Sequence, residues 1–158
     1  MEKESAAPSP SAIIIGCDHA AYPLKEAVKS HLVEAGYRLE DVGTYSCASV
    51  DYPEFGMRVA AQVSTGSYAQ GILLCGTGIG MSMVANRFQN VRAALCADPF
   101  SARLSRQHND ANILVLAGRM LGETMALETV DAWLNTPFEG GRHQKRLDMF
   151  NPAGAKPS

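Results

Sequence analysis

The chain has 158 residues, which is room for one compact domain with a sizeable core. Hydrophobic residues make up 46% and charged residues 19% of the chain, an ordinary globular balance that excludes a disordered or fibrous protein. There are 14 basic and 16 acidic side chains, so the net charge of −2 argues against general nucleic-acid binding, which usually shows a basic excess.

Along the chain, short apolar runs alternate with longer amphipathic ones. The strongest short runs are apolar on both faces, as the strands of a buried parallel sheet must be. The longer runs repeat their apolar residues at helical spacing, and two of them carry proline near the first turn. The alternation predicts an α/β domain whose parallel sheet is covered by helices on both faces. The expected strands are 12–17, 37–42, 71–75, 91–96 and 112–117, and the expected helices are 23–36, 52–66, 99–109, 122–135 and 140–150.

The cysteines and the chain ends indicate the compartment. The four cysteines lack the spacing of a zinc site or a redox pair. No apolar stretch of the sequence approaches the roughly 20 residues that span a bilayer, and the first residues lack the apolar middle of a secretory signal. We therefore expect a cytosolic protein that binds no membrane. We also expect residues 1–11 and 151–158, rich in Pro, Ser and Ala, to be disordered extensions of a single domain over 12–150.

Polar residues follow three of the expected strands. Asp18 and His19 come after the first strand, the segment 75–80 after the third, and Asp98 after the fourth. Ligands of open parallel sheets bind beyond the carboxyl ends of the strands. We therefore expect the functional site at this edge of the sheet.

The segment 75–80, Cys-Gly-Thr-Gly-Ile-Gly, follows a buried strand and opens a helix. Its glycines allow several amide groups to face one point, which predicts an anion cradle, although a tight turn alone would also use glycine. Met81 stands where a dinucleotide fingerprint needs glycine, and the Gly-Lys-Ser/Thr of a phosphate loop is missing. Cys75 lies beside these amides, which would favour a thiolate base, while inert packing is the alternative.

Two basic groups stand out near the end of the chain. His108 is in the polar segment 105–112 just before a strand, so it lies at the opposite edge of the sheet from the cradle. A symmetric dimer could bring it to the site of a partner chain, and the alternative is a helix cap. Arg142 and Arg146 are four residues apart on a short helix, so both can reach one dianion, and Arg119 could add a third cation. The alternative is that these basic residues only form a solvated helix face.

Six motifs stand in order along the chain. They are Gly16-Cys-Asp-His-Ala20, Gly43-Thr-Tyr-Ser46, Ser49-Val-Asp-Tyr-Pro53, Cys75 to Gly80, His108-Asn-Asp-Ala-Asn112 and Gly140-Gly-Arg-His-Gln144. Together they resemble the type B ribose-5-phosphate isomerases, whose wider family includes allose- and galactose-6-phosphate isomerases. The likeness runs from about Ile13 to Phe150.

The resemblance implies a Rossmann-like three-layer α/β/α sandwich with a five-stranded parallel sheet. It further implies a homodimer in which both chains build each site, while the pairing of dimers into tetramers is left open. By resemblance Cys75 moves the proton between C2 and C1, Thr77 assists on the sugar oxygens, and His108 of the partner chain opens the furanose ring. No metal or other cofactor is expected. The implied binding residues are Asp18, His19, Tyr52 and Asn109 for the sugar, Gly76, Gly78, Ile79 and Gly80 for the enediolate, and Arg119, Arg142, His143 and Arg146 for the phosphate.

Three alternatives stay open. The family usually has glycine where this chain has Ala21, and the added methyl group near the sugar could indicate a six-carbon substrate such as allose or galactose 6-phosphate. A cysteine hydrolase using Cys75 and His108 would form an acyl adduct on the cysteine. A phosphosugar sensor would bind ligand without turnover.

Overall fold

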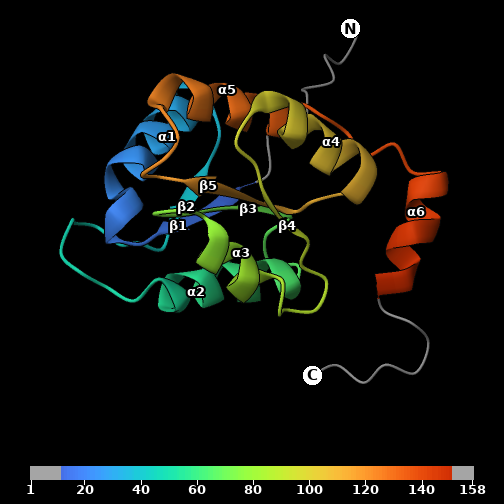
Figure 1. The fold of residues 1–158 in the computed structure, drawn as a ribbon, viewed down its shortest axis with the longest axis horizontal. Helices are drawn as coiled ribbons and strands as arrows, with labels where there is room; N and C mark the ends of the chain where they lie inside the picture. Colours follow the sequence, from blue (N-terminus) through green and yellow to red (C-terminus); the bar gives the residue numbers. More distant parts are fainter. Residues whose placement is uncertain (1–11, 151–158) are drawn as a thin grey trace, which may run out of the picture.

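The computed structural model describes residues 12–150, so the predicted extensions 1–11 and 151–158 lie outside the described residues. Five parallel strands form one sheet in the order β2-β1-β3-β5-β4 (Figure 1). The predicted parallel α/β sheet is therefore confirmed. The strands are β1 (Ile13–Cys17), β2 (Leu39–Asp41), β3 (Gln70–Cys75), β4 (Ala93–Leu95) and β5 (Ile113–Ala117).

Helices cover both faces of the sheet. Figure 1 shows α1, α4 and α5 above it and α2 and α3 below it, which gives three layers. Helix α6 lies outside this sandwich, beyond the end of α4, and the predicted helix 140–150 is divided between α6 and η2. The helices are η1 (His19–Ala21), α1 (Tyr22–Glu34), α2 (Tyr52–Ser64), α3 (Ile79–Ala85), α4 (Pro99–Asn109), α5 (Glu123–Leu134), α6 (Arg142–Leu147) and η2 (Asp148–Phe150).

The alternation of side chains along each strand divides the core between the two faces. Ile13 and Ile15 belong to the apolar cluster that contains Trp133 of α5, whereas Ile14 belongs to the cluster that contains Val59 of α2. Neighbouring residues of a strand point to opposite faces, so a strand covered on both sides must be apolar throughout. Each fully buried aliphatic side chain stabilises the fold by about 1.5–3 kcal/mol.

The two edge strands are shorter than the apolar pattern predicts. The runs 37–42 and 91–96 contribute three paired residues each, because each edge strand has a neighbour on one side alone. On β4, the side-chain amide of Asn86 donates to Ala93 O and accepts from Ala93 N. The Asn86 side chain thus satisfies the N–H and C=O groups of Ala93 that face away from β5, so this edge of the sheet does not offer them to another strand.

The chain paths after β1 and β3 diverge. The two strands are neighbours, with Cys17 opposite Leu74, yet β1 leads to α1 above the sheet and β3 leads to α3 below it. Such a divergence opens a crevice beyond the carboxyl ends of the two strands. Within residues 12–150, the helices are too short or too polar to cross a membrane.

Candidate active site

The turn after β1 forms one wall of this crevice. Asp18 is buried, and its Oδ1 accepts hydrogen bonds from the backbone N–H groups of Ala20 at 3.0 Å and Ala21 at 3.2 Å. A carboxylate at this position satisfies the free amides at the start of η1. Asp18 therefore fixes the turn that carries His19.

His19 joins this turn to the segment that precedes α2. Its Nδ1 lies 3.1 Å from the backbone nitrogen of Val50, which donates the hydrogen bond. Since Nδ1 accepts, the neutral ring carries its proton on Nε2. The bond therefore sets both the orientation of the ring and the nitrogen that can donate to a ligand.

Tyr52 and the glycine segment meet on the other side of the crevice. A Cβ atom placed on Gly80 would lie 2.6 Å from two carbon atoms of the Tyr52 ring. Because real Cβ contacts are never so short, the ring and the main chain at residue 80 touch in a way that glycine alone permits. Three segments far apart in the sequence, those of His19, Tyr52 and Gly80, thus lie close together at the carboxyl edge of the sheet.

The loop between β3 and α3 has the sharp turn that its glycines predict. Gly78 has φ of +75°, and a Cβ atom there would lie 2.4 Å from Cδ1 of Leu95. The hydroxyl of Thr77 accepts a hydrogen bond from the backbone N–H of Ile79 at 3.2 Å. This hydrogen bond stabilises the loop conformation, and the Thr77 side chain is exposed beside the loop amides.

Cys75 is the last residue of β3 and is 4% exposed. Its side chain belongs to the apolar cluster on the face of the sheet that α2 and α3 cover, which is the face that the glycine loop enters. The main chain also ties this point to the end of β5, because Gly118 N–H donates to Cys75 O at 2.8 Å and Arg119 N–H to Gly76 O at 3.0 Å. Arg119 is exposed, and its side chain lies against Gly76.

His108 and His143 form a second group. His108 lies in the last turn of α4, inside the helix predicted over 99–109. Its ring stacks on that of His143 of α6, with 4.4 Å between centroids and 12° between planes. Burial, with repulsion from His108 and Arg142, lowers the pKa of His143. Arg142 and Arg146 are exposed on α6 and Asn109 is exposed at the end of α4.

The two groups lie at opposite edges of the sheet. Helix α4 starts after the carboxyl end of β4 and returns to the amino end of the parallel strand β5, so its last turn is at the amino edge. The structure thus places together Asp18, His19, Tyr52, the segment 75–80 and Arg119. It places the second group, which contains His108, Asn109, Arg142, His143 and Arg146, away from them within one subunit.

Known proteins share this arrangement of elements. The family model described as Ribose/Galactose Isomerase matches residues 13–150. The chain belongs to this isomerase family. Ribose-5-phosphate isomerase B of Escherichia coli is 48% identical over 138 residues, which cover 87% of this chain and 93% of that protein.

Solved structures of family members agree with the fold. A ribose 5-phosphate isomerase from Thermotoga maritima is 52% identical, with a TM-score of 0.86 over 88% of this chain and 96% of its own. Ribose-5-phosphate isomerase B from Mycoplasma genitalium, solved with bound ribulose 5-phosphate, is 40% identical, with a TM-score of 0.85 over 88% of this chain and 93% of its own. These values confirm the family and the three-layer fold that the motifs implied.

Ala21, the residue that could indicate a six-carbon substrate, lies in the turn that Asp18 fixes. It is 0% exposed, and a Cβ atom on Gly118 would lie 2.5 Å from its own Cβ. The methyl group is therefore packed against the turn after β5 and is not exposed to a ligand. Direct contact of this methyl group with a sugar thus gives no argument for a six-carbon substrate, and the choice between the sugars is left to the assay.

Glu139 was missed by the sequence analysis. Its Oε2 lies 3.4 Å from Nε2 of His143, and one ligand atom from each of His108, Glu139 and His143 falls within 4.8 Å of the others. Imidazole nitrogen and carboxylate oxygen are ligands that Zn²⁺ accepts, so within residues 12–150 these three side chains form a group that could hold a metal ion. The sequence contains a weak signal for this group, because Glu139 and His143 are four residues apart, a spacing that brings side chains together within a helix. The signal is weak because Glu139 precedes the short helix α6, which begins at Arg142.

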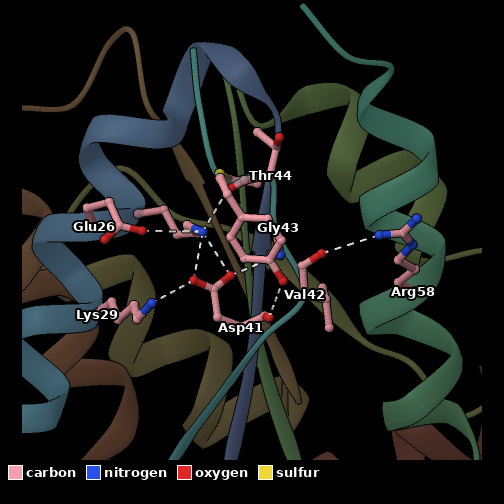
Figure 2. A network of polar contacts seen from close by, with 10 residues as sticks. Glu26, Lys29, Asp41, Val42, Gly43, Thr44 and Arg58 are labelled. Carbon is pink, nitrogen blue, oxygen red and sulfur yellow. Dashed lines mark hydrogen bonds and ion pairs between the residues drawn. The ribbon is translucent and has the colours of Figure 1, made fainter. Parts of the chain in front are cut away.

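An ion pair beside the crevice was also missed (Figure 2). The Nζ atom of Lys25 lies 2.8 Å from both carboxylate oxygens of Asp41, and Lys29 Nζ lies 2.9 Å from Oδ2. Burial by itself would raise the pKa of Asp41, but hydrogen bonds from the two lysines and from Gly43 N–H hold it below its ordinary value. The available signal was that Lys25 shares the core-facing stripe of α1 with Val28 and Leu32.

The low pKa of Asp41 predicts a dependence of stability on pH. A carboxylate with a folded-state pKa below its unfolded value stabilises the fold above the unfolded pKa, and this contribution disappears as pH falls through the folded value. We expect Asp41→Asn to lower the free energy of unfolding by about 3 kcal/mol at pH 7, because it removes the closest anion of the buried Lys25 and leaves it the more exposed Glu26 at 3.4 Å. The loss should begin to shrink below about pH 4, where the unfolded wild-type chain starts to bind a proton at Asp41, and should shrink further as the pH falls toward the lower folded-state pKa.

Thermal unfolding between pH 3 and pH 7 checks this prediction. Glu54→Gln is the control, because Glu54 pairs with Arg58 on the exposed surface of α2 and should change the Tm little at any pH. A Tm difference between Asp41→Asn and wild type that stays constant over the whole range would contradict the account.

Proposed function

We propose that this chain interconverts ribose 5-phosphate and ribulose 5-phosphate through an enediolate. The observation that carries the proposal is the match to the Mycoplasma genitalium isomerase solved with bound ribulose 5-phosphate. It is supported by the contacts that bring Asp18, His19, Tyr52 and the glycine loop together at the carboxyl edge of the sheet. We place the activity in the cytosol, as the cysteine spacing predicts.

In the proposed reaction Cys75 is the base. Its thiolate takes the proton from C2 of the open-chain aldose, and the electrons of that C–H bond form the C1=C2 double bond while O1 becomes anionic. The amides of residues 76–80 stabilise this oxygen, which is the largest single effect available to such an enzyme. Thr77 moves the proton of O2 to O1, and Cys75 returns its proton to C1, so that C2 becomes the ketone carbon.

The proposed site needs two subunits. His108, which would open the furanose ring, and Arg142, which would bind the phosphate, lie at the opposite sheet edge from Cys75 in one chain. A symmetric dimer that places the amino edge of one subunit against the carboxyl edge of the other would complete two sites. Exposed apolar side chains around the carboxyl edge support such an interface. They are Ile79, Met83, Leu95, Phe100 and Met120.

The same separation speaks against a cysteine hydrolase built within one chain. A nucleophilic cysteine needs its histidine base within hydrogen-bond reach. His108 lies at the other edge of the sheet from Cys75, and its ring stacks on His143. The isomerase, which gives His108 a separate role on the sugar ring, requires no direct contact between the two side chains.

A coupled assay tests the proposed function. Purified protein is given ribose 5-phosphate, and the formation of ribulose 5-phosphate is followed beside parallel reactions with allose 6-phosphate and galactose 6-phosphate. The proposal predicts the highest kcat/KM for ribose 5-phosphate. Preferred turnover of a six-carbon sugar phosphate would overturn the substrate assignment, and the absence of turnover with all three would indicate the sensor.

Arg142→Ala should weaken phosphosugar binding. A charge-assisted hydrogen bond contributes about 1.5–3 kcal/mol, so we expect KM for ribose 5-phosphate to rise roughly 10- to 100-fold with a smaller change in kcat. Lys145→Ala is the matched control, because it removes the same charge from the same exposed helix. An unchanged KM in Arg142→Ala would remove this residue and its neighbour Arg146 from the phosphate site.

A further inference from the structure

The buried ion pair of α1 reaches the loop that leads to Tyr52. Lys25 is 0% exposed, and its ammonium group lies 2.8 Å from Thr44 O as well as 2.8 Å from each oxygen of Asp41 (Figure 2). A buried ammonium group is tolerated when its donors are all satisfied. Asp41 supplies the nearest countercharge and Glu26, at 3.4 Å, a second one, while the loop carbonyl supplies a further acceptor.

The surroundings of the ammonium group keep it in this place. The rings of Tyr22 and Tyr45 lie 5.5 Å and 5.0 Å from Lys25 Nζ, within the range of a cation–π interaction. The Tyr45 hydroxyl also donates to Asp41 O at 2.8 Å. Lys29 binds Asp41 from the solvent side and is partly exposed, so it adds charge without contacting the loop.

The segment 43–51 is fastened to the end of β1 at two points. At its start, Cys17 N–H donates to Gly43 O at 2.7 Å and Thr44 N–H donates to Cys17 O at 2.8 Å. At its end, Val50 N–H donates to Nδ1 of His19. Residues 45–49 between these points are exposed. The first point lies where Lys25 holds Thr44, and the second sets the ring of His19.

We propose that Lys25 is a positioning residue for the sugar side of the active site. By binding Thr44 O, its ammonium group holds the segment 43–51 against β1, so that Val50 keeps His19 in its ligand-binding orientation and Tyr52 stays against Gly80. This role rests on the proposed isomerase function. It concerns the sugar and not the phosphate, because Arg119 comes from the turn after β5 and Arg142 from α6.

The kinetic test compares Lys25→Met with Lys29→Met, which removes the partly exposed lysine of the same cluster. We expect Lys25→Met to raise KM for ribose 5-phosphate about tenfold, the effect of losing one positioned hydrogen bond to the sugar. Competitive inhibition by inorganic phosphate should keep its Ki, because the phosphate residues lie elsewhere. Lys29→Met should keep both constants. A wild-type KM in folded Lys25→Met would overturn the proposal.

The double variant Lys25→Met/Asp41→Asn separates positioning from stability. Removing one partner of a buried pair leaves an uncompensated charge, whereas removing both charges restores much of the lost stability. We therefore expect the double variant to recover most of the Tm while KM stays raised, since Thr44 O still lacks the ammonium group. A KM that returns to the wild-type value together with the Tm would show that the pair acts through stability alone.

Hydrogen exchange provides a readout that needs no activity. In Lys25→Met the amides of Thr44 and Val50 should exchange faster than in wild type, while those of β5 keep their protection. Unchanged exchange at both positions would overturn the positioning role. If wild-type protein failed to isomerise ribose 5-phosphate, the proposed function would fall, and the exchange rates would still decide whether Lys25 orders the segment.

Discussion

Replacing Cys75 by alanine should lower kcat for ribose 5-phosphate by about 10³-fold, while ribulose 5-phosphate still binds. A positioned general base contributes about 10²- to 10⁴-fold to a proton transfer, and alanine has no group that can replace the thiolate. The glycine loop is main chain, so its amides stay in place in this variant. Steady-state kinetics measures the loss of turnover, and calorimetric titration with ribulose 5-phosphate measures binding.

Cys96→Ala is the matched control for this variant. Cys96 also ends an apolar run, is 2% exposed, and burial raises the pKa of its thiol, so it stays protonated and outside the reaction. Both substitutions remove one buried sulfur and should lower the Tm by similar amounts. Activity in Cys75→Ala that equals that of Cys96→Ala would exclude Cys75 as the base.

Mixing two inactive variants should restore activity. If each site combines Cys75 of one subunit with His108 of the other, Cys75→Ala and His108→Ala homodimers both lack complete sites. A hybrid dimer, however, has one site with both wild-type residues and one site with neither. Random subunit exchange makes half of the dimers hybrid, so we expect about a quarter of wild-type activity.

The exchange is carried out by mixing the purified variants in mild denaturant, followed by dilution and assay. Mixing Cys75→Ala with Cys75→Ser is the control, and it should restore nothing because every hybrid site lacks the thiol. Absence of recovery in the Cys75→Ala and His108→Ala mixture, with dimers present in solution, would show that the sites are not shared in this way.

The sheet was predictable because its central strands are buried on both faces. The runs at Ile13–Ile15, at 71–75 and at 113–117 are apolar throughout, and these lie in β1, β3 and β5. The edge strands were predicted too long, because the point where an edge strand ends depends on contacts with other elements of the fold. Asn86 binds Ala93 from another element, and no local pattern in the strand records that contact.

The candidate site was predictable where it depends on strand ends. Asp18, His19 and Cys75 follow buried strands, and the rule for parallel sheets places them together. The contact of Tyr52 with Gly80 and the bond from Val50 to His19 join segments that are distant in the chain, so they could be found only in three dimensions. The position of His108 at the amino edge could be predicted from the order of strands and helices, because the segment that contains it directly precedes β5.

The central claim is that the reaction moves a proton that a protein group exchanges with solvent. The direct measurement is incubation of the wild-type protein with ribose 5-phosphate in D₂O, followed by NMR analysis of the recovered ribose 5-phosphate. The account predicts that deuterium appears at C2 as the reaction reverses, because the thiol equilibrates with solvent before it returns the proton. Rapid interconversion that leaves protium at C2 would contradict it, since it would indicate either a direct hydride shift or a proton that is returned without exchange.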